Sequence, residues 1–147
     1  MSTVPTLPCL CATLRRATRA LTQAYEEALR PYGLRASQFT ILQALILAGE
    51  QTQGNLGRIL AMDSTTLTRT LAIMSRHRWI TRRRGDDRRE WLIALSKTGK
   101  ACFEEAFPAW QKAQARARRQ IGESRFDQLM TLTNDVTNAV TLEGDNL

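Results

Sequence analysis

The chain of 147 residues is 43% hydrophobic and 24% charged, a balance that excludes a wholly disordered chain and indicates a single domain with a buried core. Lysine and arginine number 21 against 14 acidic residues, and the net charge of +7 points to a nucleic acid, an anionic lipid or an acidic protein as partner. No apolar run approaches the roughly 18–20 residues that cross a bilayer, and the start of the chain lacks a signal-peptide pattern. We therefore expect a cytoplasmic protein without membrane contact, whose cysteines are reduced thiols.

The N-terminal third predicts a tail and two helices. Residues 1–8 are a polar tail with prolines, and apolar positions at steps of three and four predict a helix from Cys9 that ends at Pro31–Gly33. Ser37 begins a second helix and Gly49 ends it. The apolar face of this second helix consists of Phe39, Leu42, Leu45 and Ile46.

The middle of the chain predicts two short helices followed by a hairpin. Thr52 is a candidate N-cap for the first short helix, and Asp63 or Ser64 is a candidate for the second. β-Favouring residues at 80–84 and 91–95 flank the turn sequence "GDD" and predict a β-hairpin. The inward positions of the two helices are Leu56, Ile59, Leu60, Leu67, Leu71 and Met74.

Two helices follow the hairpin. Ser96 begins the first, Pro108 bends it because proline cannot donate to the preceding turn, and Gly122 ends it. The last helix runs from about residue 124 to residue 140. Its inward positions are Phe126, Leu129, Val136 and Val140. Amphipathic terminal helices around a small middle block predict a homodimer.

Two short helices and a basic hairpin, in this order, are typical of a winged helix-turn-helix, which lays its second helix in the major groove of DNA. The predicted fold class is therefore mainly α with a small β-hairpin wing, dimerising through the N- and C-terminal helices. We divide the chain into a tail with a dimerisation helix at residues 1–34, a DNA-binding lobe at residues 35–96, and C-terminal dimerisation helices at residues 97–147.

The second short helix presents hydroxyl side chains and one arginine outward if Leu67 and Leu71 are buried. Serine and threonine hydroxyls can donate or accept at base edges, and arginine pairs bidentately with guanine. The alternative is that these residues simply favour the start of a helix. The candidate base-contacting residues are Ser64, Thr65, Thr66, Thr68 and Arg69.

The hairpin and the residues before it concentrate the positive charge, since seven arginines against two aspartates leave +5 between Arg76 and Arg89. At the tip, Arg88 or Arg89 can enter a narrow minor groove while an aspartate braces it. The alternative is a solvated turn. The remaining arginines are expected to contact phosphates, which position a protein without reading sequence. These are Arg76, Arg78, Arg82, Arg83 and Arg84.

The arrangement resembles the MarR family of bacterial transcriptional regulators over nearly the whole chain. The matching segments are "GLRASQFTILQAL", "NLGRILAMDSTTLTRTLAIM" and "ITRRRGDDRREWLIALSKTG". Asp87, Arg88 and Arg89 stand on the family's wing motif, Asp-x-Arg. The resemblance implies that Arg89 enters the minor groove while Asp87 orients the wing. It also implies an obligate dimer, formed by the first and the last two helices, that reads a pseudo-palindrome in double-stranded DNA.

The cysteines are candidate sensors. Cys9 and Cys11 stand in the first turn of the first helix, where the helix N-terminus favours the reactive thiolate. The chain also resembles the organic-peroxide-sensing branch of the family, in which Cys11 falls on the reactive cysteine and Tyr25 on a tyrosine that faces it. Arg15 stands where that branch has its other tyrosine, and Cys102 is not at the position of a resolving cysteine. Packing in a helix interface, redox sensing by organic hydroperoxide, and capture of a soft metal by the three thiols remain open.

The predicted function is a sequence-specific DNA-binding regulator, a repressor that a small-molecule or oxidant signal releases from its operator. Tyr25, Phe39 and Trp110 are candidates to line a crevice for an aromatic or phenolic effector in a thiol-independent alternative, and they also suit a core. His77 fits a phosphate contact or a solvated position better than a ligand role. Because the sequence pairs no nucleophile with a base and has no metal-ligand spacing, we expect no enzyme, no cofactor and no metal site. A basic scaffold for an acidic protein is the remaining alternative.

Overall fold

The computed structural model describes residues 3–144, with side chains as far as Thr141. The elements are α1 (Leu10–Leu29), a 3-10 turn η1 (Arg30–Tyr32), α2 (Ala36–Ala48), β1 (Gln51–Thr52), α3 (Gln53–Leu60), α4 (Ser64–Arg76), β2 (Ile80–Arg84), β3 (Trp91–Leu95), α5 (Lys97–Ile121) and α6 (Glu123–Gly144). The mainly α fold with a small β-hairpin confirms this part of the predicted fold class, whereas dimerisation through the terminal helices stays a prediction.

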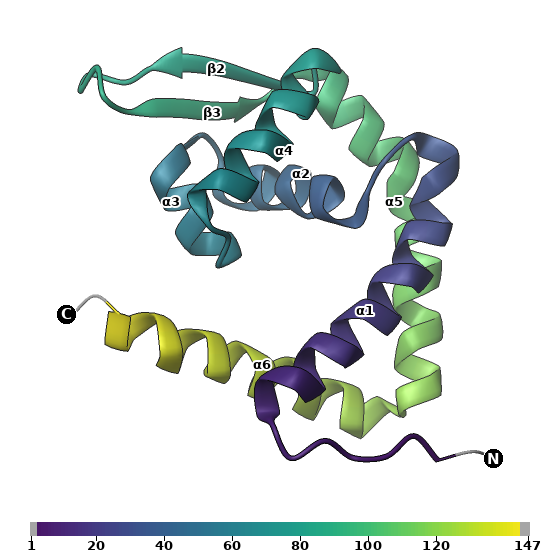
Figure 1. Ribbon diagram of the computed structural model, residues 1–147. Coiled ribbons are helices and arrows are strands. Elements are labelled where there is room, and N and C mark those ends of the chain that lie inside the picture. The colour runs from purple at the N-terminus through teal and green to yellow at the C-terminus, as the bar shows by residue number, and fades with distance from the viewer. Residues whose placement is uncertain (1–2, 145–147) are drawn as a thin grey trace.

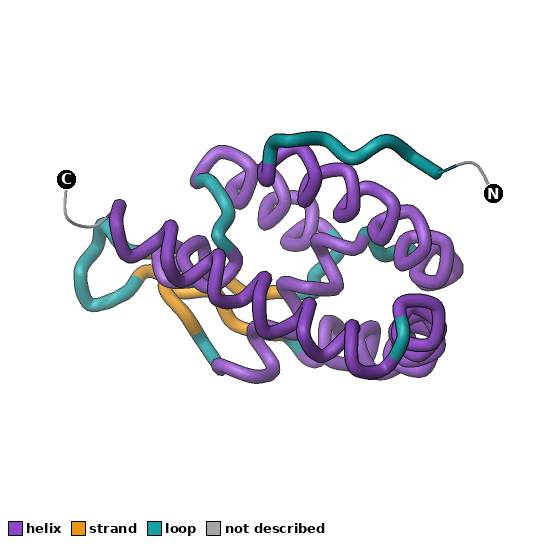
Figure 2. The backbone as a smooth tube through the Cα atoms, turned by 90° about the horizontal axis from the view of Figure 1, so that it is seen from below, coloured by secondary structure: helices purple, strands orange, loops and turns teal. Residues whose placement is uncertain are grey.

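The elements form a lobe and a set of long helices. The lobe holds α2, α3, α4 and the β2–β3 hairpin, while α1 and α5 pack against each other beside it (Figure 1). Helix α6 begins at the end of α5 that is distant from the lobe, and it extends beneath the lobe in the view of Figure 1. Seen from below, α6 crosses in front of the strands (Figure 2). No helix within residues 3–144 combines the length and apolarity that a membrane crossing requires.

The sheet contains a strand that the sequence did not predict. Its order is β1-β3-β2 with antiparallel pairing throughout. The hairpin runs from the pair Ile80–Leu95 to the pair Arg84–Trp91, as predicted. Strand β1 has only two residues, opposite Ile93 and Leu92 of β3, and a two-residue strand is too short for an alternating pattern to reveal it.

The core of the lobe continues into α5. Phe39 of α2 is 2% exposed and stacks on Phe103 and Trp110 of α5, with ring centroids 4.8 and 5.7 Å apart. These aromatic contacts fix the lobe to the long helices. Further fully buried side chains of the lobe are Ile41, Leu42, Leu56, Leu67, Leu71, Met74 and Ile93.

The first turn of α5 lies against the main chain that joins α4 to β2. A Cβ atom on Gly99 would come within 1.9 Å of the carbonyl oxygen of Trp79, so only glycine fits there. The amide of Ser96 donates to the same carbonyl oxygen at 3.1 Å. This close approach fixes the base of the hairpin relative to α5.

Three predicted helix caps are confirmed. Thr52 accepts from the amide of Asn55 at the start of α3, and Asp63 accepts from the amide of Thr66 at the start of α4. The hydroxyl of Ser96 accepts from the amide of Gly99 at the start of α5, and this helix ends at Gly122 and continues through Pro108. The bend expected at Pro108 stays a prediction.

The predicted start of α2 is wrong. The helix begins at Ala36 with Arg35 as N-cap residue, because Gln38 accepts from the Arg35 amide at 2.9 Å and Glu26 of α1 accepts from the Ala36 amide at 3.2 Å. Ser37 is therefore inside the helix. The predicted end at Gly49 is confirmed, whereas Ile46, expected on the apolar face, is 41% exposed.

Helix α6 departs most from the expected burial. Phe126 is buried as predicted, but Leu129 is 38% exposed and Val140 is 69% exposed, so the expectation that they face inward is wrong for the single chain. Residues 1–2 and 145–147, which belong to the predicted outer segments 1–34 and 97–147, lie outside the described residues.

Candidate nucleic-acid interface

The first turn of α4 is organised by Asp63. Its carboxylate accepts from the Thr66 amide at 2.8 Å and from the Thr66 hydroxyl at 2.6 Å. These hydrogen bonds, the one from the hydroxyl first, lower the pKa of Asp63 below its ordinary value. The hydroxyl proton of Thr66 is thus used by the cap, which leaves its oxygen as an acceptor toward any outside partner.

The outer face of α4 is polar. Leu67, Leu71 and Met74 are buried on the inner face, which turns the predicted base-contacting residues toward solvent. A helix with small hydroxyl side chains on its exposed first turns can approach a groove closely. The exposed residues of the predicted set on α4 are Ser64, Thr65, Thr66, Thr68, Arg69 and Arg76.

Two arginines of β2 share one aromatic platform. Side chains alternate along a strand, so Arg82 and Arg84 lie on the same face. Their guanidinium carbons lie 4.8 and 3.9 Å from the centroid of the Trp91 ring on β3. Trp91 is half-buried beneath these cations.

Arg83 lies on the opposite face of the same strand. Its guanidinium pairs with Glu50 through bonds of 2.6 and 3.1 Å, and this partner raises the pKa of Arg83 above its ordinary value. The expectation that Arg83 faces phosphate is therefore replaced by an intramolecular ion pair. This pair ties β2 to the segment before β1.

The wing tip is braced as the sequence predicted. Asp87 accepts from the amide of Arg89 at 3.0 Å, and its carboxylate lies 3.6 Å from the Arg89 Nε atom. The Arg84 guanidinium donates to the carbonyl oxygen of Arg88 at 2.8 Å. The Arg89 side chain stays 93% exposed, so its charge remains available to a polyanion.

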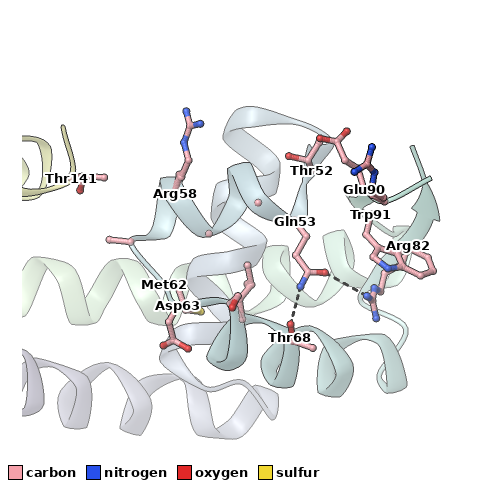
Figure 3. Close-up of a pocket in the computed structure, with 16 residues that line it drawn as sticks. Thr52, Gln53, Arg58, Met62, Asp63, Thr68, Arg82, Glu90, Trp91 and Thr141 are labelled. Atoms are coloured by element: carbon pink, nitrogen blue, oxygen red, sulfur yellow. Dashed lines mark hydrogen bonds between the residues drawn. The ribbon is translucent and has the colours of Figure 1, made fainter. Parts of the chain in front are cut away.

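A concave surface of about 920 Å³ lies between α3, the start of α4 and the hairpin. Across it, Gln53 donates from Nε2 to the Thr68 hydroxyl at 2.9 Å and accepts from Arg82 at 3.4 Å (Figure 3). The surface thus joins predicted base-contacting and phosphate-contacting residues. Its lining includes Arg58, Asp63, Ser64, Thr68, Arg82, Arg89 and Trp91.

Sequence reasoning missed three residues of this region, which are Glu50, Gln53 and Trp91. The positions of Arg84 and Trp91 on either side of the predicted turn could have revealed the aromatic platform, because these two residues are opposite each other in the register of the hairpin. Glu50 and Gln53 carry no such signal, since their partners lie far along the chain. The structure brings Thr68, Arg82 and Arg89 to one surface, while Arg76 stands at the far end of α4.

A second cavity lies at the junction of α1, α2 and α5. It measures about 230 Å³ and is lined by Tyr25, Phe39 and Trp110, the three aromatic residues predicted for an effector crevice. The Tyr25 hydroxyl donates to the side-chain oxygen of Gln114. Burial raises the pKa of Tyr25, so this phenol stays protonated and keeps its proton in the hydrogen bond.

The thiols occupy separate places. Cys9 is the N-cap residue of α1, and Cys11 is exposed two residues later beside a groove of about 510 Å³ between α1 and α6. Cys102 is half-buried on α5, and burial raises the pKa of its thiol. Tyr25 lies about 21 Å from Cys11 along α1, so the chain alone does not bring these two together.

The structure does not support the metal interpretation of the thiols. Within residues 3–144, no group of three or more histidine, cysteine, aspartate or glutamate side chains is arranged to hold a metal ion. His77 stacks on Trp79, with ring centroids 4.3 Å apart, at the end of α4.

The chain is similar to proteins of one family. The family model described as the MarR family matches residues 32–90. A Bacillus subtilis (strain 168) protein, described as the uncharacterized HTH-type transcriptional regulator YwoH, is 33% identical over 92 residues, which cover 63% of this chain and 67% of that protein.

Solved structures match over most of the chain. The M. tuberculosis transcriptional regulator MosR, in complex with DNA, is 34% identical with a TM-score of 0.82, covering 91% of this chain and 97% of that one. A single-residue variant of E. coli MarR, in complex with operator DNA, has a TM-score of 0.77 and is 23% identical. The match covers 86% of this chain and 92% of that one, and it shows a similar fold. With the helix-turn-helix and braced wing described above, these relationships show that the chain belongs to the MarR family and is a DNA-binding transcriptional regulator.

Proposed function

We propose that this regulator is a homodimeric repressor that binds a pseudo-palindromic operator and leaves it in response to a small-molecule or oxidant signal. The observation that carries the proposal is the concave surface between α4 and the wing, because it combines an exposed polar helix with braced arginines. Such a surface fits a duplex with α4 in the major groove.

The interface divides into reading and positioning contacts. Arg69 and the hydroxyl residues of α4 face base edges, where they read sequence. Arg89 enters the minor groove, with Asp87 holding its main chain. The positioning contacts with phosphate come from Arg76, Arg82, Arg84 and Arg88.

The dimer is supported by apolar side chains that the chain leaves uncovered. Leu129, Leu132, Val136 and Val140 fall at steps of three and four on α6, and Leu132 and Val140 are 62% and 69% exposed. Leu10 of α1 is 63% exposed. A second copy that covers this stripe would pair two α4 helices for two half-sites. We accordingly assign residues 1–34 and 97–147 to dimerisation and residues 35–96 to DNA binding, in a cytoplasmic protein without a catalytic role.

DNA binding is tested with a duplex that the protein itself selects from a randomised pool, using fluorescence anisotropy at several salt concentrations. We expect Arg89→Ala to weaken binding by about 1–3 kcal/mol without changing the melting temperature. Arg30→Ala, which removes the same charge from the η1 turn, is the matched control. Equal affinity of both variants would refute the wing assignment. A basic scaffold for an acidic protein would select no duplex at all.

A small aromatic or phenolic effector is the signal that the cavity favours. A volume of about 230 Å³ lies below the usual range of drug-sized sites, so it suits a single substituted ring. Its walls come from α1 and α5 on one side and α2 on the other. A ligand that binds better to one relative placement of these helices shifts the spacing of the two α4 helices in a dimer.

Oxidation of Cys11 is the second candidate signal, because this exposed thiol stands in the first turn of α1. Operator complexes are treated separately with substituted phenols and with one equivalent of tert-butyl hydroperoxide. Release by hydroperoxide that is lost in Cys11→Ser would support a thiol switch. Release by phenols that survives in Cys11→Ser and weakens in Tyr25→Phe would support the cavity. Indifference to hydroperoxide would exclude oxidant sensing by Cys9 and Cys11.

A further inference from the structure

Gln53 occupies the junction between the recognition helix and the wing. It is the first residue of α3, half-buried, and its side chain crosses the concave surface. The amide nitrogen donates to the hydroxyl of Thr68 on α4, and the amide oxygen accepts from the guanidinium of Arg82 on β2 (Figure 3). One side chain therefore joins a predicted base-contacting residue to a predicted phosphate-contacting residue.

The connection extends to the wing tip. Arg82 lies over the ring of Trp91, and Arg84 lies over the same ring at 3.9 Å. Arg84 in turn donates to the carbonyl oxygen of Arg88 at 2.8 Å. Contacts thus run without interruption from the second turn of α4, through Gln53, to the residue beside Arg89.

The chemistry of the junction requires an amide. A carboxylamide donates through its nitrogen and accepts through its oxygen at the same time, which neither an apolar nor an ionised side chain does. Arg82 needs an acceptor that leaves its charge intact for a phosphate. A neutral oxygen orients the guanidinium without cancelling that charge, whereas a carboxylate would neutralise it.

We propose that Gln53 is a positioning residue that holds Thr68 and Arg82 in a fixed relative placement, so that base reading by α4 and phosphate contact by the wing occur as one unit. This inference rests on the proposed DNA binding and assigns a coupling role within it. The consequence is measurable, since the contributions of Thr68 and Arg82 to operator affinity depend on each other only when Gln53 joins them.

The test is a double-mutant cycle of Thr68→Val and Arg82→Met, measured on the selected duplex in the wild-type and the Gln53→Leu backgrounds. Gln53→Leu keeps the size of the side chain and removes both hydrogen bonds. We expect it to lower affinity by about two- to tenfold. We also expect non-additive effects of the pair with Gln53 present and additive effects without it. Gln111→Leu on the exposed face of α5 is the control and should change neither quantity.

Gln53→Glu separates positioning from a general effect on the fold. The carboxylate can still accept from Thr68 and Arg82, but it neutralises Arg82. We expect an unchanged melting temperature, a retained base ranking at the positions under α4, and a salt-dependence slope reduced by about 1.8, because the dimer loses one phosphate contact at each of its two half-sites. If Gln53→Leu lowers the melting temperature, the salt slope of Gln53→Glu decides whether Gln53 positions Arg82.

The outcomes distinguish the two proposals. If the wild-type protein binds its selected duplex and the effects of Thr68→Val and Arg82→Met are additive in both backgrounds, Gln53 has no positioning role and DNA binding stands. If Gln53→Glu keeps the full wild-type salt slope, the contact with Arg82 is overturned. If the wild-type protein selects no duplex, the proposed function itself fails, and the inference fails with it.

Discussion

The DNA-binding lobe and helix α6 differ in how far their apolar side chains are buried within the single chain. In the lobe, most inward positions of the helices are covered by other parts of the same chain, and Leu42 and Leu71 have no exposed surface. Two positions that were expected to face inward, Ile46 of α2 and Ile59 of α3, are 41% and 47% exposed. On α6, the stripe that contains Leu132 and Val140 is largely exposed. The core of the lobe is thus closed within one chain, while the stripe on α6 stays open and is the surface that we propose for the dimer.

The same contrast holds for arginine. Arg118, at the corner between α5 and α6, pairs with Glu123 and Asp127 at 2.9 Å each and lies over the ring of Phe126. Arg89, at the wing tip, has its side chain 93% exposed and one carboxylate at 3.6 Å. Arginines that are satisfied by their own chain support the fold, and those held outward are available to DNA.

Removing a large side chain from the lobe core should have the largest effect. We expect Phe39→Ala to lower the free energy of unfolding by about 3–5 kcal/mol, because it deletes a buried ring that stacks on α5. Urea unfolding followed by circular dichroism measures this loss. The loss should be the same at all protein concentrations, and a loss that vanishes at high concentration would contradict a self-contained lobe.

A charge on the exposed stripe of α6 should act on assembly instead. We expect Leu132→Asp to weaken dimerisation by about 1.5–3 kcal/mol, the usual contribution of one buried leucine, so that the dissociation constant rises at least about tenfold. Sedimentation equilibrium measures this change. Asn138→Asp adds the same charge on the opposite side of α6 and should leave the dimer intact. Equal behaviour of the two variants would show that the stripe is not the interface.

Two arginine substitutions should separate arginines that bind DNA from arginines that stabilise the fold. Arg84→Ala should reduce the slope of log affinity against log salt by about 1.8, because the dimer loses one phosphate contact at each of its two half-sites. Arg118→Ala should leave that slope unchanged and lower the melting temperature slightly. Anisotropy titrations at protein concentrations that keep the dimer assembled give the slopes. A reduced slope for Arg118→Ala would place that residue at the DNA.

The smallest expected effect concerns the cap of α4 and depends on pH. The pKa of Asp63 is lowered in the folded protein, so its stabilisation is present above the ordinary value of about 3.9 and is lost as pH falls through the folded value. Asp63→Ala should therefore lower the melting temperature at neutral pH, and the difference from wild type should shrink in acid. A difference that is constant from neutral to acid pH would mean that the ionised carboxylate is not the cap.

The sequence predicted those features of the fold that depend on contacts between residues close together in the chain. The caps Thr52, Asp63 and Ser96, the hairpin pairing and the brace of Arg89 by Asp87 each involve residues a few positions or one turn apart. Such contacts follow from local backbone geometry, so one sequence is enough to find them.

Side-chain contacts between residues that are distant in the sequence could not be predicted in this way. Glu26 caps α2 from another helix, Glu50 pairs with Arg83, and Gln53 reaches Arg82, and no periodicity encodes such meetings. The inward assignment of Leu129 and Val140 was wrong for one chain because an apolar stripe specifies burial without specifying the chain that covers it.

The most direct test of the account is the dependence of affinity on half-site spacing. The selected operator is compared with a duplex that carries about five additional base pairs between the half-sites, which turns one half-site to the opposite side of the helix. A dimer that places two α4 helices on one face should bind the altered duplex no better than a single half-site. Unchanged affinity for both duplexes would contradict a dimer that reads two half-sites together.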